Sequence, residues 1–106
     1  MQFRRHLYVS ASLEGKEKKI IHRIQHGKYP LNVYLLTVPE NENQQLEFYD
    51  CLMLMQPLFQ NDKDLVVGLA AGYDEAVEMT KKIVEETLEK NGDVNIRKYL
   101  LESGRK

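Results

Sequence analysis

Two segments of this chain are apolar at almost every position, which restricts what the chain can fold into. They run from Leu31 to Val38 ("LNVYLLTV") and from Leu65 to Ala71 ("LVVGLAA"). A strand with one wet face alternates apolar and polar residues, whereas a strand covered on both faces does not. The two segments therefore predict strands covered on both faces, as parallel strands are. A further strand is expected from His6 to Ala11 ("HLYVSA").

Each of the three expected strands is followed by a helical pattern. The first helix is expected from Leu13 to His26 with Ser12 as its N-cap, the second from about Glu42 to Gln56, and the third from Tyr73 or Asp74 to about Lys90. A polar loop from Gln60 to Asp64 separates the second helix from the last strand. The third helix has the clearest periodicity, and its expected buried stripe consists of Val77, Thr80, Ile83, Val84, Thr87 and Leu88.

This order predicts an α/β fold with a small three-stranded, mostly parallel sheet. The elements follow as β-α-β-α-β-α with right-handed crossovers, a minimal Rossmann-like architecture. A short C-terminal helix capped by Asn95 is expected to follow, an edge strand being the alternative. The strand order stays open between a central first strand and a sequential arrangement. No repeat or linker divides the chain, so residues 1–106 are expected to form a single domain.

The charge of the chain is unevenly distributed. Residues 1–30 carry seven Lys and Arg against two Glu, and residues 31–106 carry eight Lys and Arg against fourteen Asp and Glu. The balances of +5 and −6 indicate either an anion-binding end or a head-to-tail self-association surface, with solvated helix faces as the plainer alternative. Because a three-stranded sheet is small, we expect a homo-oligomer or a protein partner.

The composition favours a cytoplasmic protein. Cys51 is the only cysteine, so no intrachain disulfide can form, and a reducing compartment suits the chain. The N-terminus shows no apolar signal region, and the longest apolar runs are too short to span a membrane. Neither a membrane nor nucleic acid is expected as a partner, since the pI is near 6.3 and no nucleic-acid-binding motif is present.

The carboxyl ends of the strands are where an open α/β sheet binds ligands. The corner after the first strand offers the hydroxyls of Ser10 and Ser12, free backbone N–H groups at a helix start, and the nearby charge of Lys16. Gly72 and Tyr73 follow the last strand and supply the opposite wall. These five residues are the expected binding site for a small anionic ligand.

The glycines of the last strand do not complete a phosphate-binding motif. Their spacing is Gly68-x-x-x-Gly72, whereas the dinucleotide fingerprint needs three glycines and the P-loop needs a Lys after its second glycine. Asp74 and Glu75 then occupy the positive end of the following helix and would repel a phosphate. The pattern therefore favours packing, with Gly68 making room for a helix that lies close over the strand.

No pattern of catalytic or metal-ligating residues emerges. His22 and His26 are four residues apart, but Arg23 stands where the zincin motif has Glu, so neither a metal site nor a cofactor is expected. Cys51 is expected to be a buried structural thiol. The sequence therefore predicts a domain without catalysis of its own that acts through self-association or a protein partner. The alternative is a binding domain, or an enzyme, for a small phosphorylated or carboxylated ligand.

Overall fold

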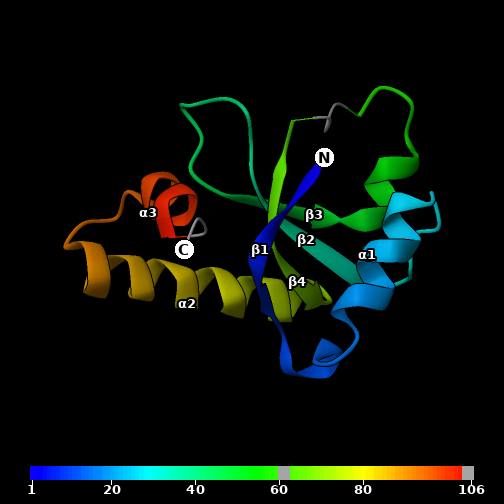
Figure 1. Cartoon of the computed structure of the whole chain (residues 1–106), viewed down its shortest axis with the longest axis horizontal. Helices are drawn as coiled ribbons and strands as arrows, with labels where there is room; N and C mark the ends of the chain where they lie inside the picture. The colour runs from blue at the N-terminus through cyan, green and yellow to red at the C-terminus, as the bar shows by residue number, and fades with distance from the viewer. Residues whose placement is uncertain (60–62, 104–106) are drawn as a thin grey trace.

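A four-stranded mixed sheet forms the centre of the structure, a computed structural model that describes residues 1–59 and 63–103 (Figure 1). Residues 60–62 of the expected polar loop and 104–106 of the expected domain lie outside the described residues. The strand order is β1-β4-β2-β3, so β4 and β2 are central. The strands are β1 (Gln2–Val9), β2 (Val33–Val38), β3 (Glu47–Asp50) and β4 (Leu65–Ala71).

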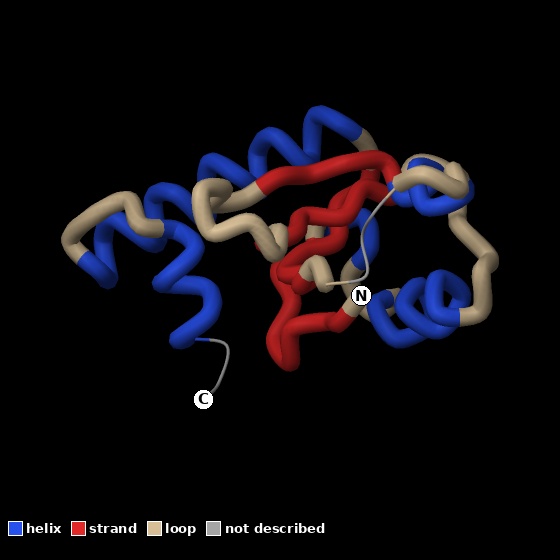
Figure 2. The backbone as a smooth tube through the Cα atoms, turned by 90° about the horizontal axis from the view of Figure 1, so that it is seen from above, coloured by secondary structure: helices blue, strands red, loops and turns tan. Residues whose placement is uncertain are grey.

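Helices lie on both faces of this sheet (Figure 2). On one face, α1 buries Ile20 and Ile24 against β2 and β4. On the other face, α2 and α3 bury Ile83 and Leu100. The helical elements are η1 (Ala11–Leu13), α1 (Glu17–Gln25), η2 (Cys51–Met55), α2 (Tyr73–Asn91) and α3 (Ile96–Ser103).

The two central strands carry the core on both of their faces. In β2, Val33 and Leu35 face the α1 side, while Leu36 and Val38 face the α2 side. All four side chains are buried, so their residue-by-residue apolar character is explained by the helices above and below. The expectation of strands covered on both faces is confirmed.

The expected three-stranded, parallel, Rossmann-like sheet is wrong. The sheet has four strands, and among the described strands only β1 and β4 run parallel. Strand β2 is antiparallel to both of its neighbours, β3 and β4. The expectation rested on a helix between the second and third strands, because parallel neighbours need such a crossover. The chain forms strand β3 there instead of a helix. Strands β2 and β4 therefore run in opposite directions, and no crossover helix joins them.

The segment expected as a helix from Glu42 to Gln56 is instead a strand followed by a short 3-10 helix. Strand β3 pairs with β2, with Phe48 opposite Leu36 and Tyr49 opposite Leu35. Aromatic residues fit a half-buried pleated surface, and the open edge of β2 gives them one. The apolar spacing of this segment matched a helical period only over a short window.

The first helix also differs from its expected form. Ser12 lies inside η1 and caps no helix, and α1 begins only at Glu17. Gly15 adopts φ +84° between the two elements, which interrupts the helical path. By contrast, the long helix and the C-terminal helix are confirmed. Asn95 caps the latter, since its side-chain oxygen accepts the backbone N–H of Lys98 at 3.2 Å.

Helix α2 packs on β4 through a glycine, as the sequence predicted. A Cβ atom on Gly68 would lie 2.8 Å from the Met79 sulfur and 3.2 Å from the Tyr8 carbonyl oxygen. Gly68 pairs with Leu36 while Val66 pairs with Thr37, so the residue between them forms a bulge in β4. The buried stripe of α2 is also rotated relative to the expected one. Its buried residues are Ala76, Met79, Ile83 and Thr87, and Leu88 is 53% exposed.

We expect Gly68→Ala to lower the free energy of unfolding by about 1–3 kcal/mol, because the added methyl overpacks the helix–strand contact. Urea denaturation of the variant and the wild type measures the difference. In a Met79→Ala background the same substitution should cost less, since the sulfur that it meets is gone. Equal costs in both backgrounds would contradict this account of the contact.

Candidate functional site

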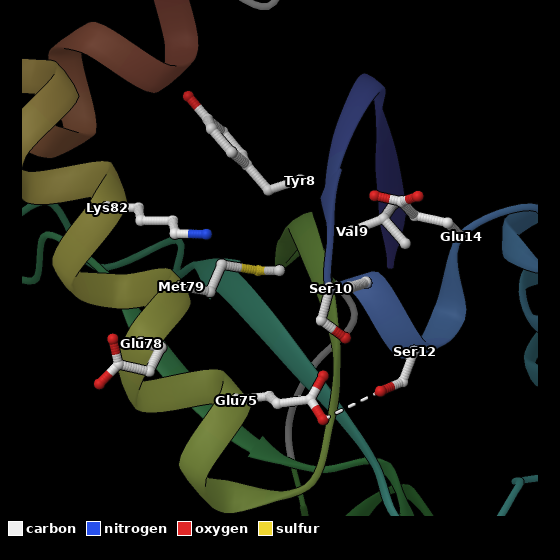
Figure 3. A pocket seen from close by; sticks show the side chains of 10 residues that line it. Tyr8, Val9, Ser10, Ser12, Glu14, Glu75, Glu78, Met79 and Lys82 are labelled. Atoms are coloured by element: carbon white, nitrogen blue, oxygen red, sulfur yellow. Dashed lines mark hydrogen bonds between the residues drawn. The ribbon is translucent and has the colours of Figure 1, made fainter.

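A groove of about 420 Å³ lies at the carboxyl end of β1, between that strand and α2 (Figure 3). Residues 8–12 form one wall, and Glu75, Glu78, Met79 and Lys82 form the other, with Glu14 at the rim. This volume is within the range of ordinary ligand pockets. The groove therefore occupies the edge of the sheet that the sequence indicated, although it is built from largely different residues.

The α2 wall follows from helical spacing. Positions 75, 78, 79 and 82 share one side of a helix, so their side chains form a row along the groove. Met79 forms the floor, where it is 7% exposed and meets the gap left by Gly68. The close approach of α2 to β4 thus places the charged side chains beside β1.

Ser10 and Ser12 both line the groove, but they have different surroundings. The Ser10 hydroxyl accepts the backbone N–H of Ala71 at 3.1 Å, and its own N–H donates to the Leu69 carbonyl at 3.0 Å. Ser10 therefore ties the end of β1 to β4. Ser12 is exposed, and its hydroxyl donates to the Glu75 carboxylate at 3.1 Å across the groove (Figure 3).

The other three expected site residues, Lys16, Gly72 and Tyr73, do not line the groove. Lys16 precedes α1 and is exposed. Gly72 has φ +90° at the start of α2, where a Cβ atom would lie 3.2 Å from the Asn32 side chain, so it serves the turn. The structure thus brings together two of the five expected residues.

Tyr73 belongs to an aromatic cluster near β3. Its ring centre lies 6.3 Å from that of Tyr34 and 5.6 Å from that of Phe48. These rings pack edge to face over β2 and β3, the strands farthest from β1 in the sheet. Tyr73 therefore extends the apolar cover of the sheet and is not the expected second wall of a site at Ser10.

The groove carries more negative than positive charge. Glu75 lies within it and Glu14 at its rim, while Lys82 extends toward it from α2 (Figure 3). Glu78 is paired with Lys81 at 3.4 Å and turns outward. This balance disfavours an anion and favours a ligand with a positively charged group.

A polar network fixes Tyr8 at one end of the groove. Its hydroxyl donates to a Glu86 carboxylate oxygen, which also accepts the Tyr99 hydroxyl at 2.8 Å. The Arg4 guanidinium lies 5.3 Å from the centre of the Tyr8 ring. Burial, followed by the contact with Glu86, raises the pKa of the Tyr8 phenol well above its usual value, so the ring remains neutral.

The titratable groups considered for catalysis lie away from the groove. The ring centres of His22 on α1 and His26 at its C-cap are 4.1 Å apart, and His26 Nδ1 lies 2.8 Å from the His22 carbonyl oxygen. Within residues 1–59 and 63–103, no three His, Cys, Asp or Glu side chains form a group that could hold a metal ion. Cys51 is fully buried as expected, and its thiol donates to the Pro30 carbonyl at 3.1 Å.

Comparison with known proteins found no match among protein-family models, curated proteins or solved structures. Among the helices of the described residues, none combines the length and apolar character needed to cross a membrane. The site must therefore be interpreted from its own geometry. Sequence reasoning did not include Glu14, Glu75 or Lys82 among the expected site residues. The i, i+7 spacing of the last two was visible, but nothing local showed that β1 lies beside them.

We expect Ser10→Ala to lower the free energy of unfolding by about 1–3 kcal/mol, because it leaves the partly buried N–H of Ala71 without its acceptor. Ser12→Ala is the matched control. It should change stability by no more than about 0.5 kcal/mol, since Ser12 is exposed. Urea denaturation of both variants checks this difference, and equal effects would contradict the separate roles assigned to the two hydroxyls.

Cys51 should be chemically inert in the folded protein. Burial raises the pKa of its thiol to about 11, so the reactive thiolate is scarce at neutral pH. We expect the reaction with Ellman's reagent at pH 7.5 to be at least about 100-fold slower in the native protein than in urea, because the thiol must first be exposed by opening. Comparable rates would show that Cys51 is accessible.

Proposed function

We propose that this chain is a non-catalytic binding domain that receives an extended, basic segment of a protein partner in the groove between β1 and α2. The segment adds to the sheet as a strand beside β1, and its basic side chains lie near Glu14 and Glu75. The free, buried thiol of Cys51 suits a reducing compartment, and the proposal places the domain in the cytoplasm.

The observation that carries the proposal is the open edge of β1 along the groove. Strand β1 pairs with β4 on one side, and among the described residues no strand pairs with its other side. The N–H of Ser10 points to β4, so the alternation of the strand turns the N–H and C=O of Val9 outward. An extended peptide binds such an edge through its own backbone, and a flanking pocket selects its side chains.

The side chains beside this edge support a basic segment. Glu75 is half-buried next to the apolar floor formed by Met79, so a Lys or Arg can rest its aliphatic part on the floor and its charge near the carboxylate. Glu14 adds negative charge at the rim. The arrangement offers little for catalysis, because the Ser12 hydroxyl is paired with a carboxylate and no His lines the groove.

The alternative, a small anionic ligand, has weaker support. It relied on five residues, of which Lys16, Gly72 and Tyr73 lie outside the groove. Without Lys16, Lys82 is the one cation that lines the groove, whereas Glu14 and Glu75 both contribute carboxylates to it. A phosphate or carboxylate at Ser10 and Ser12 would therefore meet net repulsion.

Fluorescence anisotropy with a labelled, end-blocked pentapeptide of alternating lysine and valine tests the proposal. We expect saturable binding that weakens with salt, and no binding of the glutamate–valine analogue. Glu75→Gln should weaken binding about two- to fivefold, because it removes one ion pair that solvent still reaches while keeping an acceptor for Ser12. Glu89→Gln, on an exposed position of α2 outside the groove, should leave binding unchanged.

A second peptide separates strand addition from simple charge attraction. N-methylation of its backbone on alternate residues removes the hydrogen bonds of an added strand while keeping every charge. We expect this peptide to bind at least tenfold more weakly, since loss of about 1.4 kcal/mol is tenfold in affinity. Equal binding of the methylated and unmethylated peptides, or of the basic and acidic ones, would refute the proposal.

A further inference from the structure

We infer that the outer face of α1, together with the exposed aliphatic side chains of Leu31, Met55 and Leu58 beside it, binds the surface of an anionic membrane. This inference is independent of the proposed function, because it concerns a different surface of the molecule. It departs from the expectation that no membrane is a partner. That expectation rested on apolar runs too short to span a bilayer, whereas a protein that binds at the surface needs no spanning run.

The outer face of α1 is positively charged. Ile20 and Ile24 are buried against the sheet, so the 3.6-residue period of the helix turns positions 18, 19, 22, 23 and 26 away from it. These positions carry two Lys, two His and one Arg, and all five side chains are exposed. Residues 16–28 contain five Lys and Arg against one Glu, a balance of +4. That one carboxylate, of Glu17, accepts the backbone N–H of Gly15.

The positive charge of this segment is not neutralised within the protein. Among the described residues, ion pairs join Lys63 to Glu40 and Lys81 to Glu78, and none involves a Lys or Arg of residues 16–28. The cytoplasmic leaflet of a membrane has a negative surface potential and attracts clusters of about four to eight basic residues. The five Lys and Arg of this segment form such a cluster.

The most exposed aliphatic side chains lie beside the basic face. Leu31, Met55 and Leu58 are 80%, 66% and 92% exposed, the highest values among the large hydrophobic side chains of the described residues. The Cys51 thiol donates to the Pro30 carbonyl at 3.1 Å, which joins the segment after α1 to the start of η2. Helices α1 and η2 therefore lie at the same end of the molecule, opposite α3 (Figure 1).

Leu58 lies at the tip of the turn that follows η2. The Phe59 N–H donates to the Gln56 carbonyl at 3.1 Å, and the Phe59 ring packs on Tyr49 with ring centres 4.8 Å apart. Phe59 thus anchors the turn to the sheet, while Leu58 extends into solvent. Exposed leucines next to basic side chains suit a membrane surface, where the charges meet the headgroups and the leucines enter the boundary of the acyl chains.

The same side chains favour a membrane over nucleic acid. A basic face attracts both, but proteins that bind single-stranded nucleic acid add exposed aromatic rings on which bases stack. The exposed hydrophobic side chains beside α1 are aliphatic, and Tyr29 packs against the core. Aliphatic side chains gain little from a phosphate backbone, whereas they gain from an apolar layer.

A domain bound in this way keeps its groove accessible. Helix α1 covers one face of the sheet, and α2, which forms a wall of the groove, covers the other. The anionic surface therefore meets the basic face, while the acidic groove points away from it and remains open to a partner.

Co-sedimentation with lipid vesicles tests the charge of this surface. We expect the protein to bind phosphatidylcholine vesicles that contain about 30% phosphatidylserine, to ignore pure phosphatidylcholine vesicles, and to dissociate as salt is raised. Lys18→Gln/Lys19→Gln should weaken binding about 25-fold, because each basic residue near the surface contributes about fivefold. Lys81→Gln/Lys90→Gln makes the same change in net charge at exposed positions of α2 and should leave binding unchanged.

A second pair of variants tests the aliphatic contribution. Leu58→Ser should weaken vesicle binding about three- to tenfold, since it removes an apolar side chain that enters the membrane. Leu88→Ser is the matched control, because Leu88 is 53% exposed on α2, and it should leave binding unchanged. All four positions of the test variants and their controls that carry charge are exposed, so urea denaturation should show folding close to that of the wild type.

The outcomes separate this inference from nucleic-acid binding and from the proposed function. Equal binding to the two kinds of vesicle, or a Lys18/Lys19 variant no weaker than its control, overturns the inference. Binding of a DNA duplex without binding of anionic vesicles assigns the face to nucleic acid and also overturns it. The lysine–valine peptide should bind the Lys18/Lys19 variant as it binds the wild type, so loss of either activity leaves the other standing.

Discussion

The contact between Met79 of α2 and the backbone at Gly68 of β4 governs the rest of the arrangement. A side chain on Gly68 would collide with the Met79 sulfur, so the helix can approach the central strand only where no side chain stands. The Tyr8 carbonyl closes the same space from β1, which ties the edge strand to this contact. Because this contact sets the distance between α2 and β4, it also sets the width of the groove and the position of Glu75 within it.

Local sequence signals correctly predicted the elements whose secondary structure depends least on neighbouring segments. The long charged helix has a capping glycine and a sustained 3.6 period, and it appears from Tyr73 to Asn91. The two continuous apolar runs form strands β2 and β4, and consecutive apolar residues are typical of strands covered on both faces. The segment around Phe48 was misread because its structure depends on the free edge of β2, which no local pattern reveals. That one error changed the expected direction of the strands.

The same distinction applies to the candidate site: features of one segment could be predicted, whereas contacts between distant segments could not. Ser10 and Ser12 could be placed at the rim because they directly follow an apolar run. The acidic wall could not be predicted, because it depends on β1 and α2 lying side by side. The residues that meet there are more than sixty positions apart in the sequence, as the hydrogen bond between Ser12 and Glu75 illustrates. Even the function of Ser10 needed the structure, because its hydroxyl accepts a backbone N–H from β4 and is not free for a ligand.

The two edge strands of the sheet, β1 and β3, differ in how well they are protected from pairing with another chain. This difference is the strongest reason to assign function to β1. Edge strand β3 is only four residues long, and Asp50 closes its end by accepting the backbone N–H of Leu52 as η2 begins. Short edges with charged ends resist pairing with other chains. In β1, the Arg4 guanidinium donates to the His6 carbonyl near the middle of the strand, whereas among the described residues no side chain binds the backbone of Val9. An edge that is occupied near its middle and open beside a groove at its end is suited to a specific strand partner and not to general aggregation.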